Sequence, residues 1–333
     1  MANTLWTSSL EVSRWRNELY TQAKKDTYFS RFFGGSNSVI HVKDDLKAAK
    51  GKDITFGLKM KIEGDGVTGD NTLAGNEVPI DTYSQTITLD QLRQGIISTG
   101  KMHNKKVLID FRQEALDSLK VWFAETMEQD MIDTLSLTPT RQFHGVAGAF
   151  HVDVNPETST TGVVADDVVS TAAISRLVAM AKLGNSTHGK MRPIRANGKD
   201  HWLLILHPEA AHELKNSDAF MNAQQYAMPR GSDNPLFSGA LGMWDGCVIH
   251  EHDMIKSFDN GGGGSVHYTQ NLFMGAQAGC AAFGGDHSWH EELVDRGNKL
   301  SISASIIYEF AKTTFNSADF SSISYHTLTD KLT

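Results

Sequence analysis

The segment that most constrains this chain is a helical pattern that runs from Lys105 to Leu135 without a glycine or proline. Apolar residues recur at intervals of three and four, which predicts one amphipathic helix of roughly 45 Å. Two adjacent stripes make an apolar face broad enough to pack on a sheet. One stripe consists of Leu108, Phe111, Ala115, Leu119 and Trp122, and the other of Leu116, Phe123, Met127 and Met131. We expect Leu108, Phe111, Leu119 and Trp122 to belong to the core.

A strand-like excursion precedes this helix. Apolar residues from Ile54 to Ile62 alternate with polar or small ones, and Thr82 to Leu89 alternates again, which predicts two strands with one apolar face each. Residues 64–81 between them are rich in glycine and contain four acids but no Lys or Arg. The acids are Asp65, Asp70, Glu77 and Asp81. Because an isolated two-stranded hairpin is marginal in water, we expect this one to lean on a neighbouring subunit.

The first fifty residues contain many aromatic side chains. Ser8 and Glu11 fit a capping box, which predicts a short helix. An aromatic cluster then ends at Gly34 and Gly35, and a short strand is expected at residues 39–42. The segment has too little apolar surface to fold alone. We therefore expect its aromatic residues to be covered by another surface, with Trp6, Trp15, Phe32 and Phe33 as contacts between subunits.

The rest of the chain interleaves helices and strands. The patterns predict short strands within 138–156, a helix over 166–183 that stops at Gly184, and a short helix that opens at His207-Pro208. Strands are predicted at 202–206, 246–250, 271–275 and 300–310, with a flexible turn at Gly261–Gly264. No βαβ rhythm is visible, which favours an α+β fold over a doubly wound one.

Composition excludes several classes of function. The 333 residues are 40% hydrophobic, and the formal net charge is -8 with no run of Lys or Arg. This argues against a nucleic-acid-binding surface, which needs a basic patch. The longest apolar runs are too short to span a bilayer, and no signal peptide is expected at the start. The two cysteines, Cys247 and Cys280, are expected to be buried, inert thiols.

Motifs that resemble chemistry fail in their context. The glycines at 64, 66 and 69 match a dinucleotide fingerprint, but no helical pattern follows to hold a pyrophosphate. His250 and His252 share one face of a strand, yet no third metal ligand stands at a defined spacing. The group His287, His290, Glu291 and Glu292 is equally ambiguous. We expect no catalytic residue, no metal and no cofactor.

Taken in order, these segments resemble the major capsid proteins of tailed phages, specifically the N4-like family. The resemblance covers most of the chain, and its motifs are specific through their order. They are residues 69–77 in the hairpin tip, Gln91–Arg93, Gly100–Met102, Asp110–Arg112, Trp122, His207-Pro208, Asn234–Phe237, Gly242, Gly275–Gly279, Trp289, Asp295, Asn298, Phe315-Asn316 and Asp319-Phe320.

The resemblance implies the HK97 fold, which is an α+β fold with an N-terminal arm, an extended E-loop, a P-domain with a long spine helix, and an A-domain. On this plan residues 1–50 are the arm and 51–95 the E-loop. Residues 96–165 are the P-domain with a spine helix over 105–135, 166–290 the A-domain, and 291–333 a return to the P-domain. Inter-subunit contacts are expected from the tip residues Asp65, Asp70, Asn76 and Glu77.

The resemblance further implies a structural function. Copies of the chain are expected to form an icosahedral shell of hexamers and pentamers in the virion, assembled in the host cytoplasm around double-stranded DNA that they do not bind specifically. Portal, scaffolding or decoration proteins are further expected partners. An encapsulin-like compartment, a metal-dependent enzyme and a nucleotide-binding protein remain alternatives. Removal of residues 2–33 is expected to leave a folded core that forms no stable shells.

Overall fold

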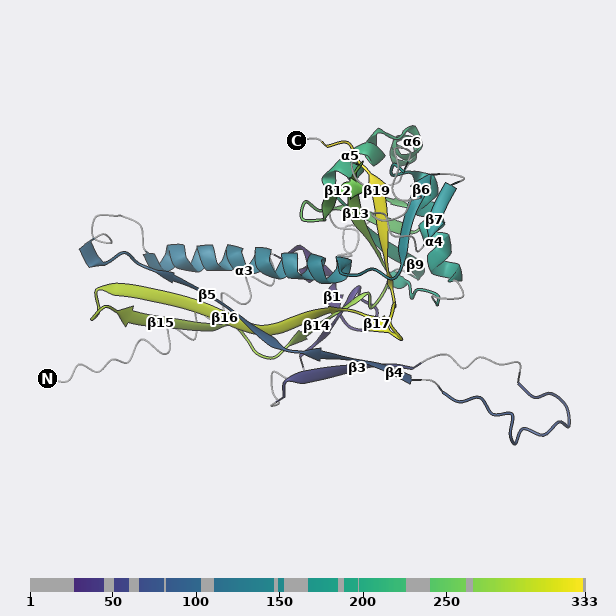
Figure 1. Ribbon diagram of the computed structural model, residues 1–333, viewed down its shortest axis with the longest axis horizontal. Coiled ribbons are helices and arrows are strands. Elements are labelled where there is room, and N and C mark those ends of the chain that lie inside the picture. The colour runs from purple at the N-terminus through teal and green to yellow at the C-terminus, as the bar shows by residue number, and fades with distance from the viewer. Residues whose placement is uncertain are drawn as a thin grey trace.

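The computed structural model describes residues 27–44, 51–59, 66–80, 82–102, 111–146, 149–152, 167–184, 189–196, 198–225, 240–261 and 266–331. These residues form an elongated subunit. A long helix lies along one sheet, and a more compact unit built on a second sheet sits at one end of it (Figure 1). A two-stranded hairpin lies on the other side of the first sheet, and its tip extends beyond the rest of the described chain.

The first sheet has six strands and forms the floor under the long helix. Five follow the order β1-β2-β14-β16-β15, and β5 also pairs with β16. The strands are β1 (Phe33–Gly34), β2 (Ile40–Lys43), β5 (Asp90–Ile97), β14 (Gly279–Phe283), β15 (Ser288–Val294) and β16 (Lys299–Lys312). Along β16, Ile302, Ala304 and Ile306 are buried, whereas the serines between them are partly exposed. This alternation gives the sheet one apolar face, and it confirms the strand predicted at 300–310.

Helix α3 (Phe111–Ser136) packs against β16. Leu119 is 1% exposed, and Phe111 and Trp122 are partly buried against the same core. Leu108 lies outside the described residues. The predicted helix is therefore confirmed from Phe111 onward and ends one residue later than expected, where the Ser136 hydroxyl donates to the carbonyl of Ile132 at 2.7 Å.

The second sheet has nine strands and forms the centre of the compact unit. Seven follow the order β10-β11-β9-β13-β19-β6-β7, while β12 pairs with β13 and β8 with β9. The strands are β6 (Gln142–Val146), β7 (Ala149–Val152), β8 (Ile194–Ala196), β9 (Lys199–Leu206), β10 (Gly242–Trp244), β11 (Cys247–Glu251), β12 (Ser257–Gly261), β13 (Val266–Met274) and β19 (Ser322–Leu328). The strands predicted near 202–206, 246–250 and 271–275 are confirmed as β9, β11 and part of β13.

Three helices border this sheet: α4 (Thr171–Leu183), α5 (Pro208–Asn216) and α6 (Asp218–Gln225). The Ser170 side chain caps α4 by accepting from the amide of Ala173, and Gly184 ends the helix with φ 68°. His207 caps α5, whose first residue is Pro208. The helix predicted at 166–183 thus starts later than expected, because a β-bridge at Val168 and the cap at Ser170 occupy its first turn.

One connection in the second sheet differs from the prediction. β9 and β11 are parallel, with Leu204 beside Ile249, and α5 and α6 lie in the chain between them. A parallel pair requires such a crossover. This strand–helix–strand order is hard to see in the sequence because β10 and a long connection separate α6 from β11. Most other pairs in both sheets are antiparallel, so the predicted α+β class is confirmed.

Strand pairing divides the chain at other points than the sequence predicts. β5 belongs to the first sheet, although the predicted E-loop runs to residue 95. β14 and β15 also belong to it, although the predicted A-domain runs to residue 290. β19 lies in the second sheet, although 291–333 is predicted to return to the P-domain. Each of these strands pairs with a partner far away in the chain, which local pattern does not reveal.

The aromatic cluster near the N-terminus lies in the core of its own subunit. Phe29 and Phe32 are 0% and 4% exposed, within the 3₁₀ helix η1 (Tyr28–Phe32). Phe32, predicted as a contact between subunits, therefore has almost no exposed surface to offer a neighbour. Phe33 is partly buried, with its ring 6.4 Å from that of Phe283. Trp6 and Trp15, like the predicted capping box, lie outside the described residues.

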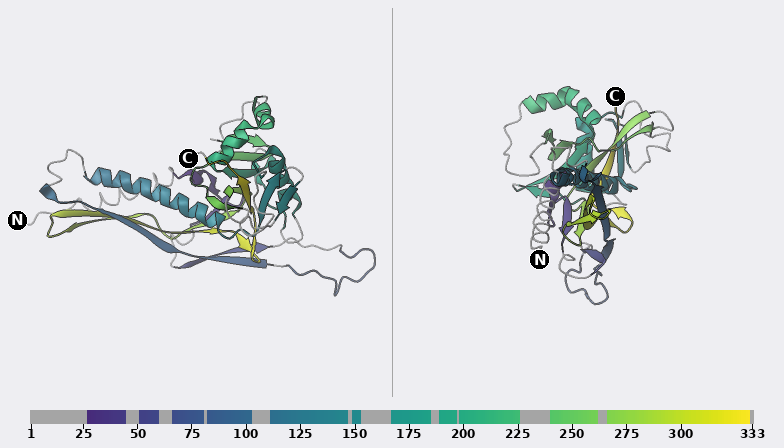
Figure 2. Two further views of the ribbon diagram at one scale, coloured as in Figure 1. Left: turned by 45° about the horizontal axis from the view of Figure 1, so that its top comes forward. Right: turned by 90° about the vertical axis from the view of Figure 1, so that its left-hand side faces the viewer.

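The predicted hairpin is confirmed. β3 (Asp53–Lys59) and β4 (Thr82–Thr88) pair antiparallel in continuous register, with Asp53 beside Thr88 and Lys59 beside Thr82. A second small hairpin, β17 (Thr314–Phe315) and β18 (Ala318–Asp319), follows β16. Two views show that β3 and β4 lie under the first sheet on the side away from α3 (Figures 1 and 2).

Candidate assembly surfaces

The foot of the hairpin, which we define as β3 and β4, is anchored to its own subunit. Ile54, Phe56 and Ile87 are 3–7% exposed and form a separate apolar cluster with Cys280 and Ala282 of β14. The side chain of Gln85 adds two hydrogen bonds, because it donates to the Lys312 carbonyl at 2.8 Å and accepts from the Thr314 amide at 3.0 Å. The expectation that the apolar faces of these strands rest on a neighbour is wrong for these three residues.

The tip of the hairpin, residues 66–80, has the opposite character. Within it every residue except the half-buried Val67 is exposed, including three large apolar side chains. Leu73, Val78 and Ile80 are 60%, 47% and 48% exposed. Three exposed large apolar residues within one short segment make the tip a candidate contact surface.

Hydrogen bonds of the tip are local. The Asn76 side chain donates to the Thr72 carbonyl at 2.9 Å, and Glu77 accepts from the Gly75 amide at 2.7 Å. The Asn76 amide also closes a turn on the Leu73 carbonyl at 2.9 Å. Asn76 and Glu77, predicted as contacts between subunits, therefore shape the turn that presents Leu73, and Asp70 is exposed beside it. Asp65 lies outside the described residues.

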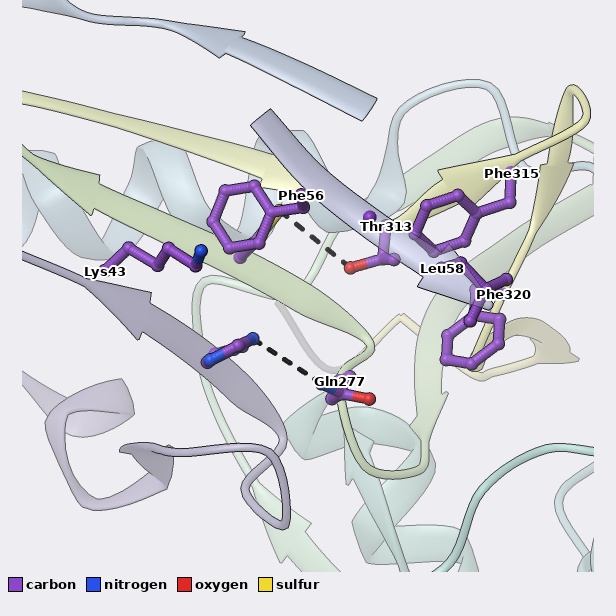
Figure 3. Close-up of a pocket in the computed structure, with 10 residues that line it drawn as sticks. Lys43, Phe56, Leu58, Gln277, Thr313, Phe315 and Phe320 are labelled. Atoms are coloured by element: carbon purple, nitrogen blue, oxygen red, sulfur yellow. Dashed lines mark hydrogen bonds between the residues drawn. The ribbon is translucent and has the colours of Figure 1, made fainter. Parts of the chain in front are cut away.

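A cavity of about 120 Å³ lies beside the foot, and we call it the foot cavity (Figure 3). Four segments far apart in the sequence line it: β2, β3, the start of β14 with the turn before it, and the region from β17 to Phe320. Its apolar wall includes Phe56, Leu58, Phe315 and Phe320, and the last two rings meet edge to face at 5.5 Å. Gly66 and Gly69 of the dinucleotide-like motif lie in the exposed tip, where residues 66–80 contain no helix, and Gly64 lies outside the described residues.

Beside Phe56, the lining of the foot cavity carries the basic side chain of Lys43. The Lys43 ammonium lies 5.2 Å from the centre of the Phe56 ring, and His41 lies next to Gln277, whose Nε2 is 3.5 Å from the His41 Nδ1. Arg192 donates to the Gln277 side-chain oxygen at 3.1 Å. Burial and the charges of Lys43 and Arg192 lower the pKa of His41. Sequence reasoning missed this site because it is assembled from distant segments, although Phe315 and Phe320 flank a recognisable turn.

The candidate metal ligands have other contacts. His252 is 3.0 Å from the Glu128 carboxylate of α3, and its ring lies 4.6 Å from that of Tyr28. The His250 ring lies 5.5 Å from that of Phe32. Among the described residues, no group of three or more His, Cys, Asp or Glu side chains is arranged to hold a metal ion. His250 and His252 therefore help to seat η1 on the body of the subunit.

The second histidine group is also part of the packing. His287 is 1% exposed, its ring lies 5.1 Å from that of Phe123, and burial lowers its pKa to about 4. Glu291 joins the start of α3 to β15 through a 2.6 Å ion pair with Arg112. His290 and Glu292 are exposed. Both cysteines are buried as expected, and burial raises the pKa of Cys280 to about 11.

Similarity to known proteins points to one family. Residues 3–327 match the family model described as "Phage capsid protein". The major capsid protein of Pseudomonas phage KPP25 is 30% identical over 342 aligned positions, which cover 91% of this chain and 89% of that protein. The capsid structure of Ralstonia phage GP4 has a TM-score of 0.78 at 26% identity, with 92% of each chain covered. The capsid structure of cyanophage Pam1 has a TM-score of 0.73 at 21% identity, with 92% of this chain and 93% of that one covered.

The architecture is the HK97-like capsid fold. The chain belongs to the phage capsid protein family. It is a major capsid protein of a tailed-phage head, a structural component of the virion that self-assembles into a shell and not an enzyme. None of the described helices is long and apolar enough to cross a membrane.

Proposed function

We propose that copies of this protein assemble as hexamers and pentamers into a closed icosahedral shell, held together in part by the hairpin tip of each copy lying across a neighbour. One observation carries the proposal. Residues 66–80 expose three aliphatic side chains and make their hydrogen bonds locally, while the foot below them is fixed to the body. A segment held out in this way gains burial when it lies on another copy.

The parts of the fold then have distinct roles. The arm (1–50) contributes η1 and β2 to the subunit core. Its contacts with other subunits are therefore made by Phe33, Trp6 and Trp15. The E-loop proper is the hairpin over about residues 51–89. The P-domain is α3 with the first sheet, and the A-domain is the compact unit with the second sheet, including β19. Strand pairing supports these assignments over the boundaries expected from the sequence.

The shell encloses double-stranded DNA without binding it specifically. The net charge of -8 supports this proposal, because a container that does not neutralise phosphates lets DNA slide during packaging and exit. Portal, scaffolding or decoration proteins complete the particle, and assembly takes place in the host cytoplasm.

The test replaces residues 64–77 by a short Gly-Ser turn. We expect the circular dichroism and thermal unfolding of the unassembled subunit to stay nearly unchanged, and closed shells to be absent by electron microscopy. A Gly-Ser segment of the original length is the control that separates loss of side chains from loss of reach. If the shortened variant unfolds, the tip belongs to the subunit core, and if it still closes into normal shells, the contact between subunits is wrong.

A further inference from the structure

The foot cavity and the tip complement each other in size and polarity. At about 120 Å³ the cavity is far below the roughly 300–1,000 Å³ of small-molecule sites, so it suits a single side chain better than a ligand. Its wall is aromatic and aliphatic, as Figure 3 shows for Phe56, Leu58, Phe315 and Phe320. The most exposed apolar residue of the tip is Leu73, at 60%. An aliphatic side chain of this kind fills such a cavity and displaces water from it.

The charges also match. The tip carries Asp70 and Glu77 and no Lys or Arg, whereas Lys43 lines the foot cavity and Arg192 donates to the side chain of Gln277, which also lines it. Glu77 stands four residues after Leu73, on the same turn. Seating Leu73 in the cavity therefore brings acidic groups to the basic side of its rim. Complementary charges of this kind fix orientation and favour correct partners over wrong ones.

The occupant must come from a second copy. β3 runs from the cavity toward the tip, and the paired strands hold the tip at a distance from the foot in both views (Figures 1 and 2). Resting on the proposed function of the tip, we propose that Leu73 of one subunit docks in the foot cavity of the next, with Asp70 and Glu77 beside Lys43 and Arg192.

This contact is heterologous, since two different surfaces of the chain meet. Each copy donates one tip and accepts one, so the contact repeats head to tail from copy to copy. The copies form a closed ring when the rotations between neighbours add up to a full turn. The foot then has two roles. The same strand β3 holds its own tip in place and, through Phe56 and Leu58, forms the wall that receives the neighbour's tip.

A cross-linking experiment tests the placement. In a Cys280→Ala background, Leu73→Cys combined with Phe320→Cys is assembled and then oxidised. We expect a ladder of covalent oligomers in denaturing gels. The matched control pairs Leu73→Cys with Leu183→Cys, which is 73% exposed at the end of α4, and we expect no ladder. Normal shells from the first pair that yield no more cross-link than the control would overturn the docking site.

Charge reversal provides a second test that does not depend on introduced cysteines. We expect Asp70→Lys and Lys43→Glu each to lower the yield of shells about tenfold or more, and the double reversal to recover most of it. If the double variant assembles no better than the worse single one, the two charges do not face each other. The variant with the shortened tip separates the two proposals. If that variant forms no shells but the cysteine pair gives no cross-link, only the docking in the foot cavity is refuted. If that variant forms normal shells, both proposals are refuted.

Discussion

The two ends of one hairpin behave as parts of different structures. At the foot, Ile54 and Phe56 are buried against β14 of the same subunit. At the tip, Leu73 and Val78 are exposed although they are equally apolar. The difference shows that apolar content alone does not assign a segment to the subunit core. Because the foot is fixed to the body, the exposed tip points in a defined direction. An assembling subunit needs a contact surface that is oriented in this way.

The largest loss of stability is expected from a substitution in α3, in the core of the subunit that carries the hairpin. We expect Leu119→Asp to lower the free energy of unfolding by more than about 3 kcal/mol, because it places a carboxylate without a designed partner at a site that is 1% exposed. Leu73→Asp, at the exposed tip, is the matched control and should leave the subunit folded. Urea unfolding of both unassembled variants checks the contrast, and a soluble Leu119→Asp subunit of normal stability would refute the placement of α3.

At the foot, we expect Phe56→Ala to cost about 3 kcal/mol of unfolding free energy. The ring is 7% exposed and packs with Ile54, Ile87 and Cys280, so its removal leaves a cavity. Leu73→Ala is again the control, with little effect on the isolated subunit. Equal stability of the two variants in denaturant would mean that the foot is no more anchored than the tip.

The sequence predicts those parts of the fold whose pattern is local. The spacing of Leu116, Leu119 and Phe123 identifies α3, and the alternation in β3 and β4 identifies the hairpin, because each periodicity reflects one buried face. The stop at Gly184 and the start at Pro208 are equally local, and both are confirmed.

What the sequence does not predict depends on distant partners. The aromatic cluster looks too large for its segment, and the surface that covers Phe29 and Phe32 comes from the same chain, near His250 and His252. Truncation of residues 2–33 would therefore remove core side chains, and we now expect it to destabilise the subunit. The foot cavity is missed for the same reason, since β2, β3, β14 and Phe320 meet only in the folded chain.

Acid should affect the body before it affects the tip. Because burial lowers the pKa of His287 to about 4, the unfolded chain binds a proton between about pH 6.5 and 4 that the folded chain does not. Stability is therefore lost as the pH falls through this window, by about 2 kcal/mol at pH 5 from this group alone.

We expect His287→Gln to show a correspondingly smaller loss of stability between pH 7 and 5 than the unchanged protein. His290→Gln, an exposed histidine three residues away, is the control and should retain the full loss. Denaturant unfolding at several pH values measures the difference. Identical pH profiles for His287→Gln and the unchanged protein would contradict the assignment.

The smallest effect on the subunit, and the sharpest form of the comparison, is expected for Val78→Ser. Val78 is 47% exposed in the tip, so the serine removes an apolar surface that the isolated subunit does not bury. We expect the unfolding free energy to change by less than about 0.5 kcal/mol, as for surface substitutions in general. Assembly should nevertheless become weaker, because that surface is covered only when the tip lies on a neighbour. Urea unfolding of the dilute subunit and light scattering during assembly give the two values. A stability loss comparable to that of Phe56→Ala would place the tip in the subunit core, and unchanged assembly would show that Val78 lies outside the contact.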